Sequence, residues 1–169
     1  MAPNQPGTHA TRDTRPPRVT AEDGLRALRD HVVETAQRAR QRYGGRIDDA
    51  AMRRMLSDER VVRYPVELRF DAQPLEPGEF AYVEPIGTHP AQGFVLYVHP
   101  RFRDRPDLLP LLIAYHLVRV NYGNVATYEE AELFGSTLLG LDRDAYYERL
   151  CDAADEIWGR PSPCVEPHP

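Results

Sequence analysis

The chain contains no lysine, and all 21 of its basic residues are arginine. Without a side-chain amine it can have neither a Schiff-base lysine nor the P-loop that depends on a lysine. The signatures G-x-G-x-x-G, G-x-S-x-G and H-E-x-x-H are missing as well. These absences exclude the usual dinucleotide-binding loop, the nucleophile elbow of the α/β-hydrolases and the standard zinc peptidase motif.

Cysteine and long apolar runs are also scarce. The two cysteines, Cys151 and Cys164, are too few for a disulfide scaffold, and a bridge between them stays open. No apolar stretch approaches the roughly 20 residues that span a bilayer. Residues 1–19 lack the apolar core of a secretory signal. We therefore expect a cytoplasmic protein with no membrane partner.

The composition is that of one soluble domain, with 41% apolar and 28% charged residues in a chain of 169. Prolines cluster in residues 1–19 and 160–169, which are predicted to be flexible tails around a single domain at 20–159. The net charge of −5 argues against a dedicated nucleic-acid binder. Residues 1–63 carry 13 arginines and 9 acidic residues, whereas residues 126–169 carry 3 and 10. This asymmetry favours docking to a charged partner, or a homodimer formed head to tail.

Helix-capping residues and apolar spacing predict five helices. The first runs from Thr20 to the Gly44-Gly45 pair, and the second from Asp48 to about Leu56. The fourth begins at Thr127, where Glu130 completes a capping box, and the fifth begins at Asp142.

The third helix is the most distinctive segment. Its stretch from Leu111 to Val120 is apolar nearly all round, and only His116 and Arg119 form a polar strip. A helix that is apolar on every side is predicted to lie in the centre of the fold.

Three short segments are predicted to be strands: residues 64–70, 80–83 and 94–98. Pro65 places the first of them at a sheet edge, or makes it start after the proline. Consecutive short strands favour an antiparallel meander. The predicted fold class is α+β, with a small three-stranded antiparallel sheet packed against the buried central helix and four further helices.

This order of elements resembles, over roughly residues 60–140, the minimal zincin scaffold of the small gluzincin-type metallopeptidases. In that family the central helix carries H-E-x-x-H, the next helix supplies a glutamate ligand, and the preceding strand binds peptide. In this chain only His116 matches, because Leu112 and Ile113 occupy the positions of the first histidine and of the general base. Glu129 or Glu130 falls near the third ligand. The resemblance therefore implies a scaffold that has lost hydrolysis, since zinc hydrolases need three ligands and a base.

His116 has two interpretations. Burial would keep its imidazole neutral and available for metal ligation or proton transfer. Alternatively it is a core histidine that hydrogen-bonds Glu130, Glu129 or a backbone carbonyl. Arg119 is expected to pair with a carboxylate in preference to binding a substrate anion.

The remaining candidate ligands have structural alternatives too. Glu129 and Glu130 suit the first turn of a helix, where they cap it and complement its dipole. His89 and His99 flank the last strand, and could join His116 in a three-histidine metal site or simply lie in loops.

The sequence thus favours a non-catalytic, zincin-like binding, regulatory or accessory protein, with no cofactor. A protein or peptide partner would pair with the last strand where that strand meets the central helix. The predicted groove consists of Tyr97, His99, Tyr115, His116 and Arg119. The alternative is an enzyme or a metal-binding protein that holds a divalent metal through His116 with Glu129 or Glu130, and with His99.

Overall fold

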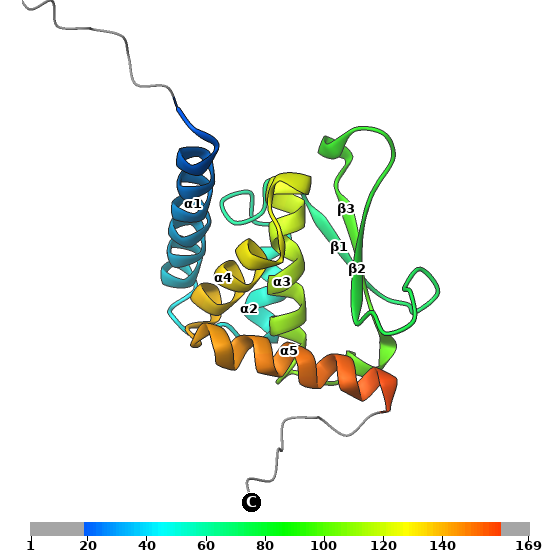
Figure 1. Ribbon diagram of the computed structural model, residues 1–169. Coiled ribbons are helices and arrows are strands. Elements are labelled where there is room, and N and C mark those ends of the chain that lie inside the picture. The colour runs from blue at the N-terminus through cyan, green and yellow to red at the C-terminus, as the bar shows by residue number, and fades with distance from the viewer. Residues whose placement is uncertain (1–18, 160–169) are drawn as a thin grey trace, which may run out of the picture.

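The computed structural model describes residues 19–159 (Figure 1). The two predicted tails, apart from Val19, and Cys164 lie outside this range. The helices are α1 (Ala21–Arg42), α2 (Asp49–Met55), α3 (Leu109–Tyr122), α4 (Tyr128–Leu139) and α5 (Arg143–Trp158). The strands are β1 (Val66–Phe70), β2 (Ala81–Pro85) and β3 (Phe94–Val98). The α+β class is therefore confirmed.

The predicted starts of the helices are confirmed by the capping hydrogen bonds found there. The side chain of Thr20 accepts a hydrogen bond from the Asp23 N–H at the start of α1. Asp48 and Asp142 accept from backbone N–H groups at the starts of α2 and α5. Such caps satisfy N–H groups that a helix leaves unpaired in its first turn, so a local sequence signal is enough to locate them.

The sheet is mixed, and the predicted antiparallel meander is wrong. The strand order is β1-β3-β2, with β1 parallel and β2 antiparallel to β3. β3 lies between β1 and β2, so these two strands, although consecutive in the chain, are not neighbours in the sheet. β1 does begin directly after Pro65 at a sheet edge, as predicted, and the Pro65 carbonyl accepts from the Phe94 N–H at 2.9 Å.

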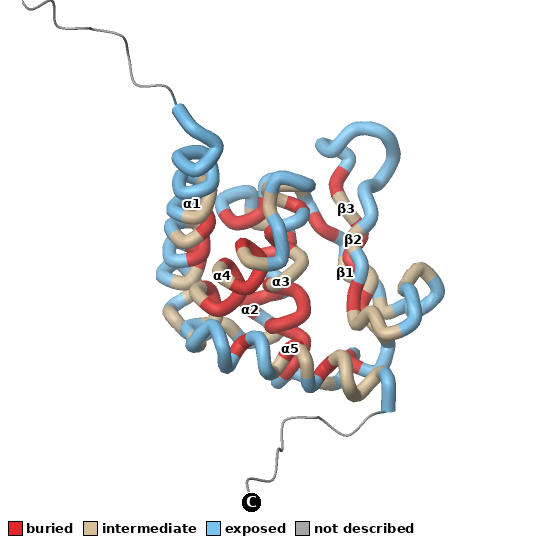
Figure 2. Tube along the Cα trace, viewed as in Figure 1, coloured by how far each residue is buried: buried red, intermediate tan, exposed pale blue. Residues whose placement is uncertain are grey.

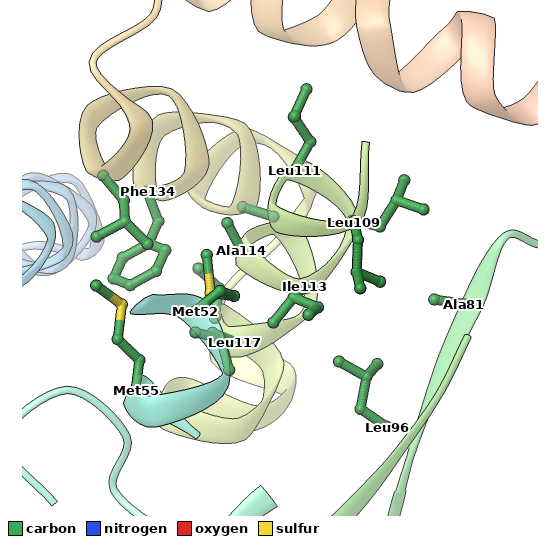
Figure 3. Close-up of a cluster of buried hydrophobic side chains, with 14 of the residues drawn as sticks. Met52, Met55, Ala81, Leu96, Leu109, Leu111, Ile113, Ala114, Leu117 and Phe134 are labelled. Atoms are coloured by element: carbon green, nitrogen blue, oxygen red, sulfur yellow. The ribbon is translucent and has the colours of Figure 1, made fainter. Parts of the chain in front are cut away.

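Helix α3 lies between the sheet and the other helices (Figure 1). Buried residues gather along it and on the facing sides of its neighbours (Figure 2). In the core, Ile113 and Leu117 of α3 lie between Leu96 of β3 and the methionines of α2, with Phe134 of α4 nearby (Figure 3). Ile113 and Leu117 are fully buried, and burying a side chain of this size contributes about 1.5–3 kcal/mol. The predicted central position of this helix is confirmed.

A buried tyrosine links α5 to the central helix. The hydroxyl of Tyr146, which is fully buried, donates to the Leu111 carbonyl of α3 at 2.7 Å. Gly135 of α4 leaves the space for it, because a Cβ there would overlap the tyrosine hydroxyl. Across residues 19–159, no helix combines the length and the apolar character needed to cross a membrane.

Candidate functional site

A cleft of about 740 Å³ opens between β2, the second half of α3 and the start of α4. Its walls include Ala81, Val83 and Pro85 of β2, His116 and Arg119 of α3, and Tyr128 of α4. This volume lies within the roughly 300–1,000 Å³ of typical ligand sites.

The pairing of β2 with β3 determines which backbone groups point into the cleft. Beside the strand ends, the His99 N–H donates to the Phe80 carbonyl at 2.8 Å, and the Ile86 N–H donates to the Gly93 carbonyl at 2.9 Å. In an antiparallel pair the bonded residues alternate along the strand. The even-numbered residues from 80 to 86 therefore bond to β3.

The odd-numbered residues of β2 face the other way. Ala81 and Val83 direct both N–H and C=O toward the outer edge, and Pro85 directs only its carbonyl there because proline has no N–H. Within residues 19–159, β2 pairs with no strand other than β3. An unpaired strand edge therefore forms one wall of the cleft, and such an edge is a template for another strand.

His116 lies in the opposite wall, on α3. Its ring packs edge to face against Phe80, with 5.7 Å between ring centroids, and against Tyr115 at 5.4 Å. Burial lowers the pKa of His116 from 6.5 to about 4, so the imidazole is neutral near pH 7. Its Nε2 is buried and has no hydrogen-bond partner among the described residues. The expected bond from this nitrogen to a glutamate or a carbonyl is not formed, although a buried polar atom without a partner costs about 1–3 kcal/mol.

The carboxylates of Glu129 and Glu130 bond to Arg29 and Thr127 and not to His116. Glu130, 1% exposed, accepts from the Thr127 N–H at 2.8 Å and from the Arg29 Nε at 3.1 Å. Glu129 also pairs with the Arg29 guanidinium. Burial alone would raise the pKa of Glu130, but the hydrogen bonds from Thr127 and Arg29 outweigh it and lower that pKa to about 2. The structural interpretation of these two carboxylates therefore accounts for their contacts, and no bond joins either of them to His116.

His89 and His99 do not join His116. The Nδ1 of His99 accepts from the Arg101 N–H at 3.2 Å, and the Nδ1 of His89 accepts from the Ala91 N–H at 3.1 Å. Each ring caps a short 3₁₀ turn, and the two turns lie at opposite ends of β3. No group of three metal-ligating side chains exists within residues 19–159, so the three-histidine arrangement is not formed.

The predicted groove is only partly brought together. Tyr115, His116 and Arg119 line the cleft, whereas Tyr97 and His99 do not. Tyr97 is cross-strand to Tyr82 on one side and to Arg69 on the other, on the sheet face away from α3. The prediction that a partner strand adds to β3 is wrong, because β3 is the middle strand and both of its edges are occupied. Sequence reasoning missed Ala81 and Val83, since nothing local marks β2 as an edge.

No family model, curated protein or solved structure matched the chain.

Exposed aromatic and apolar side chains surround the cleft. Tyr128 and Tyr82 line it with 64% and 39% of their surfaces exposed, and Val125 lies beside it at 72%. Exposed tyrosine is enriched where proteins bind one another, because the ring is apolar and its hydroxyl still bonds water or a partner. This rim is typical of a surface that contacts a macromolecule.

The charged side chains in the cleft are Arg63, Arg119 and Glu79. No ion pair within 4.0 Å involves Arg119 or Arg63 among the described residues, so the carboxylate partner expected for Arg119 is not present there. The Arg63 guanidinium stacks over the Tyr64 ring at 5.5 Å. Two cationic groups are therefore available to an occupant of the cleft.

Proposed function

We propose that this chain is a non-catalytic binding protein that holds an extended segment of a partner protein in the cleft, paired with the outer edge of β2. The observation that supports this most strongly is the backbone of Ala81 and Val83, which pairs with no strand of residues 19–159 on its outer side and faces an open cleft. Addition of a strand to a free sheet edge is a common mode of peptide recognition.

The opposite wall suits the side chains of such a segment. Alternate residues of an added strand point to the same side, and on the helix side they would meet α3. There, beside the rings of Phe80 and Tyr115, His116 offers a neutral imidazole whose Nε2 bonds to no group of residues 19–159. Three outward positions on β2 would hold a segment of roughly five residues, given strand periodicity.

The residues that replace the zinc peptidase motif support binding without cleavage. Leu112 and Ile113 are fully buried in the core, and neither side chain can take a proton from water. Glu129 and Glu130 are held by Arg29. We propose that this chain shares with the gluzincin scaffold only the order and arrangement of its elements. A strand edge would still bind peptide, whereas the ability to hydrolyse it is lost.

The test distinguishes binding to the backbone edge of β2 from binding to other parts of the cleft. Random twelve-residue peptides displayed on phage are selected against the full chain, and the selected peptides are then measured on Val83→Pro and Val83→Ala. Proline removes the outward N–H of residue 83 and leaves the bonds to β3 intact. The alanine variant keeps that N–H and controls for the lost side chain.

We expect peptides that bind Val83→Pro about ten-fold more weakly than Val83→Ala, as loss of one backbone hydrogen bond predicts. Circular dichroism checks that both variants are folded. If selection yields no peptide with this difference, the proposal is wrong.

A second candidate function, binding of a divalent metal, is favoured by one observation. Within the described part of the chain the buried Nε2 of His116 has no hydrogen-bond partner, and neutral imidazole nitrogen is a common metal ligand. Further ligands would have to come from a partner or from side chains that now bond elsewhere.

A further inference from the structure

The cleft has opposite charge at its two ends. Glu79 lies just before β2, at the amino end of that strand. Arg63 lies near the carboxyl end, because the Tyr64 ring packs against Phe94 at 5.9 Å and Phe94 is cross-strand to Pro85.

Arg119 belongs to the same cationic end. The backbone N–H of Arg63 donates to the Oδ1 of Asn121 at 2.8 Å, which brings the segment before β1 against the last turn of α3. Arg119 lies in that last turn and is exposed. It is three residues after His116, so both side chains occupy one face of the helix.

The guanidiniums of Arg63 and Arg119 differ from those of the arginines that form ion pairs within the fold. Arg29 and Arg105, for example, hold carboxylates of Glu130 and Glu156. Arg63 and Arg119 have no carboxylate within 4.0 Å among residues 19–159, yet a guanidinium stays charged and presents donors in a planar fork that matches a carboxylate.

From this arrangement we infer that the partner segment is acidic: an aspartate or glutamate side chain binds Arg119 and Arg63 at the carboxyl end of β2. This inference rests on the proposed function. It specifies that the residue of the bound segment that fixes its register on β2 is acidic. The end beside Glu79 disfavours a second acidic residue, because like charges repel there.

The experiment uses the same phage library, with each peptide fused to the coat protein through its carboxyl end. A free terminal carboxylate is then absent, so any acid that binds must be a side chain. Selected peptides are sequenced, and each is resynthesised with its acid replaced by the matching amide. Both forms are measured on the native chain and on Arg119→Gln, Arg63→Gln and the control Arg69→Gln, which removes the same charge from the opposite face of the sheet.

We expect an aspartate or glutamate at one fixed position, and a loss of ten-fold or more in affinity for Arg119→Gln with a smaller loss for Arg63→Gln. Arg69→Gln should bind like the native chain. The amide peptides should bind Arg119→Gln and the native chain alike, because the charge pair is already broken.

Two results would overturn this inference and leave the proposed function standing. In the first, the selected peptides depend on the Val83 N–H but carry no enriched acid. In the second, they bind Arg119→Gln and Arg69→Gln equally. A failure to find any peptide that depends on that N–H overturns both.

Discussion

The buried carboxylate of Glu130 in α4 accepts a hydrogen bond from the Nε of Arg29 in α1, at 3.1 Å, across 101 positions of sequence. The same carboxylate accepts from the backbone and the hydroxyl of Thr127, at 2.8 and 2.6 Å. The Glu130 side chain therefore caps α4 and also links α4 to α1. Glu130 is therefore part of the framework that supports one wall of the cleft.

Glu130→Gln should lower the free energy of unfolding at pH 7 by about 1–3 kcal/mol, because a charge-assisted bond to a buried acceptor is lost. The pKa of Glu130 is lowered from 4.5 to about 2, so its contribution is complete above pH 4.5 and is lost as the pH falls toward 2. Urea unfolding at pH 7 and pH 3 measures both effects. The control Glu129→Gln removes a half-buried partner of Arg29 and should cost less than about 1 kcal/mol. Equal losses in the two variants would contradict this role of Glu130.

His116 should make the fold sensitive to mild acid. Its pKa is lowered from 6.5 in the unfolded chain to about 4 in the folded one. Between these values the unfolded chain binds the proton and the folded chain does not, so stability falls as the pH drops from 6.5 to 4. At about 1.4 kcal/mol for each pKa unit, the loss is on the order of 3 kcal/mol.

His116→Leu should remove this acid sensitivity. At pH 7 it should leave the free energy of unfolding unchanged or raise it, since Nε2 makes no hydrogen bond with the residues that the structure describes. Urea titrations at several pH values from 7 to 4 test both statements. A loss above about 1 kcal/mol at pH 7 would instead indicate a core histidine with a hydrogen bond.

Gly135→Ala should destabilise the fold by about 1–3 kcal/mol, as overpacking of a rigid core does. The new Cβ would overlap the hydroxyl of Tyr146 and displace it from the Leu111 carbonyl. Gly24→Ala is the matched control, because a Cβ there meets nothing within 4 Å in a helix, and it should stabilise by up to about 1 kcal/mol. Thermal unfolding of both variants gives the comparison. If Gly135→Ala is as stable as the native chain, Tyr146 does not fix α5 as described.

The metal alternative is decided by elemental analysis of the full chain, purified without chelator. With Glu129 and Glu130 held by Arg29, we expect a substoichiometric metal content that is the same in the native chain and in His116→Ala. One equivalent of zinc in the native chain that disappears in His116→Ala would establish the second candidate function.

Local signals predicted the helices because their determinants lie within a few residues. Thr127 with Glu130, and the apolar stretch around Ile113, act through neighbouring backbone groups and helix periodicity. The central position of α3 followed directly, and with it the place of His116 in a wall beside the sheet.

Relations between distant segments could not be predicted in this way. The insertion of β3 between β1 and β2 depends on the path of residues 71–80, which no strand pattern records. The bond from Arg29 to Glu130 and the exposure of the edge of β2 depend on that same tertiary arrangement. For this reason the sequence assigned the groove to the wrong strand, although it named three of the side chains that line it.

Amide hydrogen exchange at single residues tests the central claim most directly. In the free chain the N–H groups of Ala81 and Val83 should exchange fast, and those of Tyr82 and Glu84, bonded to β3, slowly. A saturating peptide from the selection should slow Ala81 and Val83 at least ten-fold, with little change at Tyr82 and Glu84. If the peptide binds and both outward amides exchange as before, no strand pairs with the edge of β2 and the account is wrong.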